Sequence, residues 1–451
     1  MSVRDYVASS RDRYLEWYTE ACSIPSLAGN PEGLASMAAW LEGKFEMVGA
    51  SVERLSYESA PDALLALIGP PGGEVLVYDH YDVQPVDPLD LWLSDPFSPE
   101  IRDDVFYARG AADNKGDLVA RLAGLDTYLK LWGEIPVGIK LLVEGEEETG
   151  SKSFPSLVSR YGDKLQAEGC IWEGAGLDHA GAPEFVFGAK GLAYVELNCR
   201  GLNDDQHSSV AVYTPSPVWR LLDALQSLRG ADGRVLIVGF YDDVRKPTRA
   251  DIKMLKNLPF DEAGEKKRLG IDEFIGGDSG LDFLMRTYFE PTCNIAGLSS
   301  GFTVPGSSKT VLPKEAMAKV DMRLVPDQDP GDIVVKLRRH LDGHGFADVT
   351  TTTFSMEHPV RSPSNTRVTR AALNAAEAVF DKPPAKSPFM IATGPMYPIA
   401  HTLGIPTVSP GGVCRPSSNI HAPNENVRVN DFLKTIEYTV NWIDALAKTP
   451  A

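Results

Sequence analysis

Four short segments of the chain carry side chains that can bind metal ions or transfer protons, and their ionisable residues come just after apolar runs. The first segment is Val75–Asp82, in which His80 and Asp82 follow the run Val75–Tyr78. Residues two apart on an extended strand point to the same side, so His80 can bind a metal ion while Asp82 orients it or a neighbour. A strand end that carries ordinary polar surface residues is the alternative for this segment.

Carboxylates characterise the second and third segments. In Arg109–Gly116, Asp113 lies among small residues, where a turn can expose both of its oxygens as a bridge between two cations, although a helix N-cap explains this spacing more simply. In the third segment, residues 144–151, four glutamates fall within five positions, directly after the apolar run Ile139–Val143. A nearby metal ion or basic side chain would relieve the repulsion between these carboxylates. We therefore expect a functional site in this segment rather than a solvated helix face.

The fourth segment is the loop Asn419–Glu425, which contains His421. A single loop histidine is usually just exposed, so His421 matters only together with the other three segments. A set of histidines and carboxylates without thiolates suits zinc, manganese or cobalt in a hydrolytic site. The five cysteines are an odd number without CxxC spacing, which argues against both a thiolate zinc site and a disulfide framework.

Strand and helix patterns alternate over the first 190 residues, and these elements must position the four segments. Short apolar runs predict strands at 64–68, 75–78, 139–143 and 170–172. Helical spacing predicts helices over 3–22, from Asn30 onward and over 117–131. The alternation predicts an α/β fold with a mostly parallel central sheet and flanking helices, in which sites form at the carboxyl ends of strands.

The pattern changes after residue 188. Strand-like alternation or helical spacing predicts strands at 191–200, 315–325 and 347–355, helices at 215–228 and 331–343, and a charged, turn-rich stretch at 240–290. These elements suit a small two-layer α+β domain inserted at 190–356. The α/β pattern then resumes, with a helix near 366–380, a strand at 406–409 and a final helix from Asp431, so residues 1–189 and 357–451 form the main domain.

Composition excludes several classes of protein. The chain has 451 residues, 44 Lys and Arg, 62 Asp and Glu, and a net charge of −18, so nucleic acid is a poor partner. We expect no membrane partner, because the apolar runs are too short to span a bilayer. The charged N-terminus does not look like a secretory signal, so we expect a cytoplasmic protein. No GxGxxG or GxxxxGK[ST] pattern follows the first strand, which argues against a nucleotide-dependent enzyme.

The order HxD, GAADNKG, EGEEETGS and HAPNE resembles the two-metal metallopeptidase family that includes carnosinase, cytosolic nonspecific dipeptidase, glutamate carboxypeptidase, aminoacylase and succinyl-diaminopimelate desuccinylase. Residues 78–87, 309–313 and 323–326 are especially similar to its dipeptidase branch. The resemblance spans essentially the whole chain. It implies that the main domain is catalytic and holds two metal ions, and that residues 190–356 form a lid and dimerisation domain.

The resemblance also implies a role for each matching residue of the main domain. Two divalent cations, zinc with manganese or cobalt as alternatives, would be bound by His80, Asp113, Glu148, Glu173 and His421. Asp113 would bridge them, and Asp178 is the alternative to Glu173. Glu147 would act as general base and Asp82 would orient a ligand. The bond between Asp113 and Asn114 would be cis.

In the inserted domain, the resemblance implies that His207 reaches the active site of the other subunit of a homodimer, and that Thr310 and Arg323 grip the substrate. Gly394 matches the loop that holds the substrate carboxylate, but residues 392–399 lack its serine and are one residue longer.

We therefore expect metal-dependent hydrolysis of the amide bond of a dipeptide or small peptide. An N-acyl amino acid deacylase is the alternative. A second alternative is a non-catalytic relative that binds metal or amides. The presence of the general base Glu147 argues against this alternative.

Overall fold

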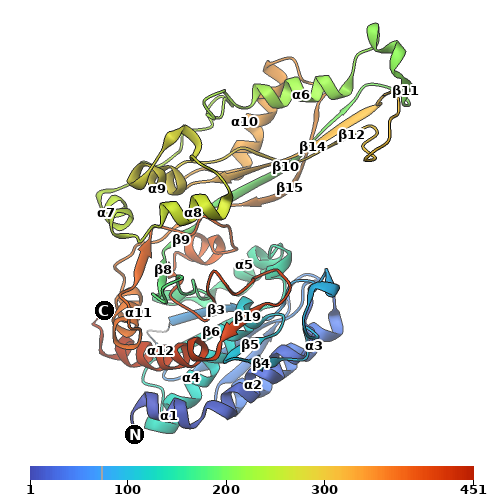
Figure 1. Ribbon diagram of the computed structural model, residues 1–451. Coiled ribbons are helices and arrows are strands. Elements are labelled where there is room, and N and C mark those ends of the chain that lie inside the picture. The colour runs from blue at the N-terminus through green and yellow to red at the C-terminus, as the bar shows by residue number, and fades with distance from the viewer. Residues whose placement is uncertain (73–74, 451) are drawn as a thin grey trace. The chain divides into compact units, whose positions relative to one another are not determined.

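The computed structural model describes residues 1–72 and 75–450, and these separate into two compact units (Figure 1). The first unit comprises residues 1–188, 362–388 and 395–451. The second unit comprises residues 189–361 together with the strip 389–394. This strip belongs to the second unit because the ring of Phe389 packs on Phe289 and the backbone N–H of Lys190 bonds to the carbonyls of Met390 and Ala392.

A six-stranded sheet in the order β1-β2-β6-β3-β7-β18 forms the centre of the first unit. Strands β6, β3, β7 and β18 run parallel, while β2 is antiparallel to β6 and β1 to β2. The bounds are β1 Ser51–Leu55, β2 Ala63–Ile68, β3 Val75–His80, β6 Ile139–Glu144, β7 Gly169–Ile171 and β18 Thr407–Val408. All six residues of β3 are buried, as expected of a central parallel strand.

Helices cover both faces of this sheet, so the predicted α/β fold with a mostly parallel sheet is confirmed. Consecutive residues of a strand point to opposite faces of the sheet. In β3, Tyr78 packs on Phe154 of α5 on one face, and Asp79 pairs with Arg121 of α4 on the other. Helix α4 also packs against α12, which packs against α11. The helices are α1 Val3–Ser9, α2 Arg11–Ser23, α3 Pro31–Met47, α4 Gly116–Trp132, α5 Phe154–Leu165, α11 Arg367–Val379 and α12 Val429–Lys448.

The single helix predicted over 3–22 is wrong, because α1 and α2 are separate. Ser10 lies between them with ψ near 7°, and its backbone N–H bonds to the carbonyls of Tyr6 and Val7. The spacing of apolar residues continues through this break, so periodicity could not reveal it.

Shorter strands complete the first unit. Strands β4 Glu100–Arg102, β5 Val105–Tyr107 and β19 Asn426–Arg428 form an antiparallel sheet in the order β19-β5-β4. Strands β8 Glu184–Val186 and β17 Ala385–Ser387 pair in parallel. Strands β9 Gly188–Ala189 and β16 Val360–Arg361 lie where the chain passes between the units. The pairing of β19 with β5 brings residues 421–425 beside residues 108–113.

The second unit is a four-stranded antiparallel sheet, in the order β12-β14-β10-β15, with α6 and α10 packed on one face. Alternate residues of β10 and β14 are buried, which is the pattern of a sheet with one covered face. The bounds are β10 Gly191–Arg200, α6 Pro217–Ser227, β12 Asn294–Ser300, β14 Glu315–Leu324, α10 Pro330–Gly343 and β15 Thr350–Glu357. A small pair, β11 Gln206–His207 and β13 Val311–Leu312, carries His207.

The stretch 240–290, predicted to be turn-rich, contains three helices, α7 Arg249–Asn257, α8 Glu262–Leu269 and α9 Gly280–Phe289. Side chains of Thr248 and Asp261 cap the first two, and the rings of Phe260, Phe274 and Phe283 stack together. These helices are short and charged, and therefore their apolar pattern was too brief to recognise. Across the described residues, no helix is both long and apolar enough to span a bilayer.

Candidate active site

His80 ends strand β3, and Asp82 fixes its surroundings. The imidazole of His80 is fully buried, and its Nδ1 lies 3.2 Å from the carbonyl and 3.4 Å from the carboxylate of Asp82. The same carboxylate accepts hydrogen bonds from the backbone N–H groups of Glu147 (3.2 Å) and Glu148 (2.9 Å). Asp82 thus ties His80 to the turn that follows β6 and carries both glutamates.

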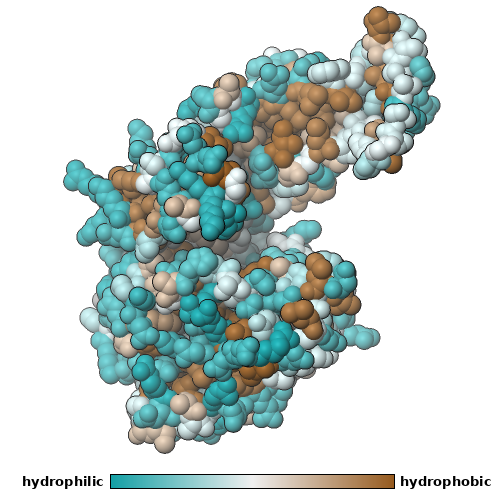
Figure 2. Space-filling view, in the orientation of Figure 1, coloured by the Kyte–Doolittle hydropathy of each residue, from teal (hydrophilic) through white to brown (hydrophobic). Residues whose placement is uncertain are grey.

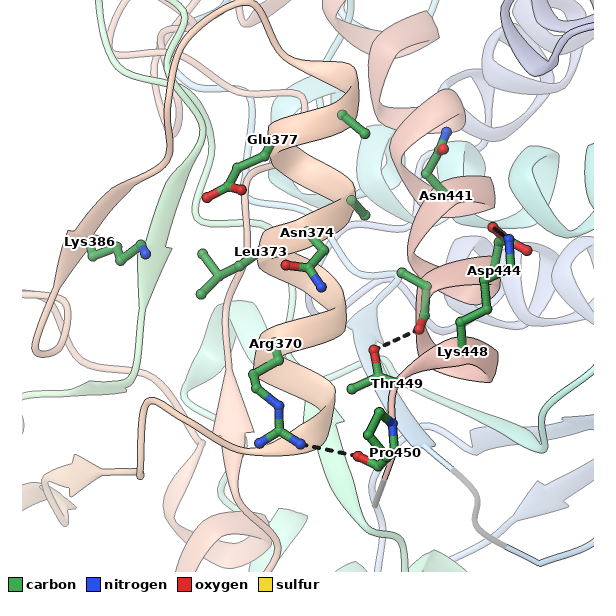
Figure 3. Close-up of a pocket in the computed structure, with 13 residues that line it drawn as sticks. Arg370, Leu373, Asn374, Glu377, Lys386, Asn441, Asp444, Lys448, Thr449 and Pro450 are labelled. Carbon is green, nitrogen blue, oxygen red and sulfur yellow. Dashed lines mark hydrogen bonds and ion pairs between the residues drawn. The ribbon is translucent and has the colours of Figure 1, made fainter.

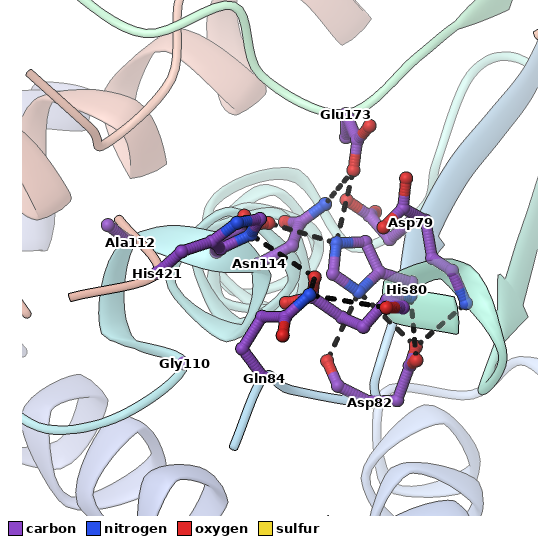
Figure 4. Close-up of polar contacts among 12 residues, drawn as sticks. Asp79, His80, Asp82, Gln84, Gly110, Ala112, Asn114, Glu173 and His421 are labelled. Atoms are coloured by element: carbon purple, nitrogen blue, oxygen red, sulfur yellow. Dashed lines mark hydrogen bonds and ion pairs between the residues drawn. The ribbon is translucent and has the colours of Figure 1, made fainter. Parts of the chain in front are cut away.

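Asp113 lies between the imidazoles of His80 and His421, and Figure 4 labels both histidines. Its Oδ1 is 3.1 Å from Nε2 of His80, and its Oδ2 is 3.0 Å from Nε2 of His421. The following bond, from Asp113 to Asn114, is cis, as the resemblance implied. Each oxygen of this single carboxylate therefore faces a different histidine, which is the arrangement that a bridging ligand needs.

Each histidine also faces its own glutamate. Glu173 Oε2 lies 3.3 Å from Nε2 of His80, and Glu148 Oε2 lies 3.2 Å from Nε2 of His421. We call His80, Glu173 and Asp113 Oδ1 the first subsite, and His421, Glu148 and Asp113 Oδ2 the second subsite. The five residues predicted as ligands thus lie together. Asp178, the alternative to Glu173, instead accepts a hydrogen bond from Ala182 in a nearby turn.

Three further side chains hold the glutamates of the two subsites, and sequence reasoning missed them. Asn114 Nδ2 donates to Glu173 at 2.9 Å, and Trp172 Nε1 donates to its other oxygen at 3.0 Å. Gln84 Nε2 donates to Glu148 Oε2 at 2.9 Å. Each of the three lies within a few positions of a predicted ligand in the sequence. Nothing in the pattern of residue types, however, marks them as hydrogen-bond partners of the two glutamates.

The site concentrates negative charge. Burial, followed by the nearby carboxylates, raises the pKa of Glu147 well above its usual range, and burial also raises the pKa of Glu148. Hydrogen bonds to Asp113 and Glu148 raise the pKa of His421 to about 10. Burial opposes ionisation of Asp113, but the two imidazoles outweigh it and lower the pKa of that carboxyl. Positive charge inside the cluster is therefore strongly favoured.

Two divalent cations fit this donor set. Oxygens and imidazole nitrogens that share one zinc ion stand roughly 3–3.5 Å apart, and the contacts within each subsite are 3.0–3.3 Å. Ligand atoms of His80, Asp113 and Glu148 all fall within 4.8 Å of one another. Glu148 Oε1 is buried and, within the described part of the chain, has no hydrogen-bond partner, as expected of an oxygen that serves as a metal ligand.

A separate groove of about 700 Å³ lies between α11 and α12 (Figure 3). Its lining includes Arg370, Glu377 and Lys448, and it shares no residue with the two subsites.

The predicted catalytic residue His207 and the predicted substrate-binding residues Thr310, Arg323 and Gly394 of the second unit form two groups. His207 is exposed, and its Nε2 lies 3.1 Å from the hydroxyl of Thr310. Arg323 donates from Nη1 to the hydroxyl of Thr393, which directly precedes Gly394. The structure thus brings His207 to Thr310, and Arg323 to the loop of altered sequence.

Residues 76–445 match the model of peptidase family M20/M25/M40. The chain belongs to this family. Among the curated M20 relatives, mouse Beta-Ala-His dipeptidase is 30% identical over 423 residues, which cover 88% of this chain and 84% of that protein. The Cys-Gly metallodipeptidase dug1 of Schizosaccharomyces pombe is 24% identical, over 98% of this chain and 97% of the relative.

Solved structures of M20 proteins agree with this assignment. The M20 family metallo-carboxypeptidase Sso-CP2 from Sulfolobus solfataricus is 37% identical, with a TM-score of 0.90 over 96% of this chain and 99% of the other. Human carnosine dipeptidase 1 is 25% identical, with a TM-score of 0.80 over 99% of each chain. This M20 protein is therefore a metal-dependent peptidase.

Proposed function

We propose that this protein hydrolyses the amide bond of a dipeptide or short peptide at two divalent cations, with zinc as the first candidate and manganese or cobalt as alternatives. The observation that carries the proposal is Asp113, whose two oxygens face His80 and His421 at 3.1 and 3.0 Å. Each histidine has its own glutamate, so the five residues provide two subsites with a shared ligand. The dipeptidases and the carboxypeptidase among the relatives support peptides as substrates.

When bound, the cation pair would acidify a water molecule and polarise the scissile carbonyl. Glu147 would accept the proton of the attacking water and return it to the leaving amine. It adjoins the ligand Glu148 on the turn that Asp82 holds, and its carboxylate lies within electrostatic reach of His80, Glu173 and Asp113. Asp82 would keep the imidazole of His80 oriented.

We propose that Thr310, Arg323 and Gly394 bind the substrate. The guanidinium of Arg323 can pair with a carboxylate in bidentate fashion. The loop lacks the serine expected from the family pattern, but Thr393 places a hydroxyl beside Arg323. We propose that this hydroxyl helps to hold the substrate carboxylate.

The proposed assembly is a homodimer formed through the second unit, in which His207 completes the partner's active site and stabilises the developing oxyanion. Strand β12 stands at the end of its sheet, and Ile295 and Leu298 on it are 51% and 54% exposed. Figure 2 shows hydrophobic residues among polar ones on this unit. An edge strand with exposed apolar side chains can pair with a second chain, which supports the dimer.

The cytoplasmic location stays a prediction from the sequence.

The test is turnover of a panel of dipeptides and N-acyl amino acids by metal-free protein to which zinc, manganese or cobalt is added. We expect hydrolysis of at least one class of dipeptide, restored by at least one metal and absent without it. Hydrolysis of N-acyl amino acids alone would show a deacylase instead. Metal binding without turnover of either class would support a binding protein and contradict the proposal.

A further inference from the structure

Glu425 ends the loop of His421, and its carboxylate is completely buried against the loop of Asp113. Oε1 accepts hydrogen bonds from the backbone N–H groups of Ala112 (2.7 Å) and Asp113 (3.0 Å). Oε2 accepts one from the N–H of Gly110 at 2.9 Å. One side chain therefore binds three amides of the turn that presents the bridging ligand.

The guanidinium of Arg109 completes the surroundings of this carboxylate. Arg109 is 1% exposed, and its Nη1 lies 2.8 Å from Glu425 Oε2. Its Nη2 donates to the carbonyl of Pro85 at 3.0 Å, on the segment that follows His80 and Asp82. The ion pair thus joins three stretches of chain, and each of them carries a residue of the site.

The backbone around His421 needs such a restraint. His421 has φ 60°, Asn419 has φ 55° and Asn424 has φ 61°, which L residues rarely adopt. Conformations of this kind persist only where surrounding contacts hold them. Two sets of contacts hold the loop of His421 in this conformation. The side chain of Asn424 bonds to the backbone of Leu91 and Leu93, and the carboxylate of Glu425 bonds to the turn of Asp113.

We propose that Glu425, with Arg109 as its counter-ion, is a positioning residue that sets the spacing between Asp113 and His421 and thereby determines the affinity of the second subsite. The inference rests on the proposed two-cation function. His421 and Asp113 are both ligands of the second subsite, whereas only Asp113 belongs to the first. Loss of the carboxylate should therefore weaken the second cation more than the first.

The decisive variant is Glu425→Gln, which keeps the size of the side chain but removes its charge. An amide offers one acceptor oxygen, so it cannot satisfy three backbone N–H groups and the guanidinium together. Isothermal titration of metal-free protein with Zn²⁺ measures the two affinities, and elemental analysis after dialysis gives the number of ions retained. We expect the weaker binding step to lose about 10–100-fold in affinity, with a smaller loss at the other step.

Asp431→Asn is the matched control. Asp431 is 2% exposed and forms an ion pair with Arg415, and among the described residues no hydrogen bond or ion pair joins its side chain to either subsite. The same change from carboxylate to amide should lower the melting temperature of the metal-free protein while both zinc affinities stay as in the wild type. If Asp431→Asn weakened the second cation as much as Glu425→Gln, the effect would come from general loss of stability, and the inference would fail.

Glu425→Asp covers the case in which Glu425→Gln does not fold. It keeps the charge beside Arg109 but is shorter by one methylene, so it cannot reach every amide, and we expect an intermediate loss at the second subsite. Wild-type affinity for both cations in each folded Glu425 variant would overturn the role of Glu425 but would leave the proposed function intact. Failure of the wild-type protein to bind two cations would instead overturn the proposed function.

Discussion

Glu144 shows how burial changes the chemistry of a single residue. Its Oε1 accepts hydrogen bonds from the hydroxyls of Tyr78 (2.6 Å) and Ser151 (2.8 Å). Burial raises the pKa of Glu144 to about 8, although both hydroxyls favour the ionised form. A carboxyl whose pKa rises from 4.5 on folding stabilises the native state below that value, and the contribution is lost as pH rises through 8.

Glu144→Gln should therefore change how stability depends on pH. Relative to this variant, the metal-free wild type should lose free energy of unfolding between about pH 5 and pH 8, by up to roughly 1.4 kcal/mol per pH unit. Urea denaturation of both proteins at several pH values across this window measures the difference. A difference that does not vary with pH would show that Glu144 has an ordinary pKa in the folded protein.

Residue types and their order were sufficient to single out the four segments, because donor side chains follow apolar runs in them. The five candidate ligands were selected only through the resemblance to a metallopeptidase family, which left Asp178 as the alternative to Glu173. The partners of those ligands could not be selected in this way. Gln84, Asn114 and Trp172 are ordinary polar or aromatic residues, and their roles depend on which side chain lies opposite in space. Glu425 stood within the HAPNE segment, yet only the packing of two distant loops shows what it binds.

At the scale of elements, α4 and α12 pack closely where Gly124 meets Thr439. A Cβ atom at Gly124 would lie 2.4 Å from the methyl carbon of Thr439, whereas a Cβ at Gly43 in α3 would meet nothing within 4 Å. Gly124→Ala should therefore destabilise the protein by roughly 1–3 kcal/mol through overpacking. Gly43→Ala should stabilise it by up to about 1 kcal/mol, because alanine favours a helix.

Thermal and urea unfolding of these two alanine variants measure the contrast. Since both substitutions add the same methyl group inside a helix, only the space around each glycine differs. Equal effects of the two variants would mean that α4 and α12 do not pack as closely as the structure has them.

Elements were predictable where a pattern was long and uniform. The central strands β2, β3, β6 and β7 and the helices α3, α4, α11 and α12 of the first unit, and β10, β14 and α10 of the second, follow their periodicity closely, whereas helix α5 was not predicted. The break at Ser10 and the three helices within 240–290 were missed for different reasons. At Ser10 the periodicity runs on unbroken, and α7, α8 and α9 depend on caps and on a cluster of phenylalanines that form only in three dimensions.

At the scale of the whole molecule, the proposed dimer makes a prediction about mixed subunits. Glu147→Gln lacks the base, and His207→Ala lacks the residue that we propose completes the partner's site, so each protein alone should be inactive. After subunit exchange in an equal mixture, half of the dimers would be mixed and one of their two sites would be intact. Activity should then recover to about a quarter of the wild-type value.

Size measurement and a labelled-subunit assay establish whether exchange has occurred in that mixture. No recovery after demonstrated exchange would contradict the shared site. A protein that stays monomeric at assay concentrations would exclude it altogether. The sequence implied this assembly only through its resemblance to a family, because no residue pattern by itself states which surface meets a second chain.

The most direct test of the central claim is the metal content and dipeptide turnover of Glu147→Gln, measured on one preparation beside the wild type. The claim is that five residues hold two cations through Asp113 while Glu147 transfers the proton. We predict two bound cations per chain in both proteins and a loss of turnover of about 10²–10⁴-fold in the variant. Turnover near the wild-type rate with two cations bound would contradict the role of Glu147, and a single cation in both proteins would contradict the bridged site.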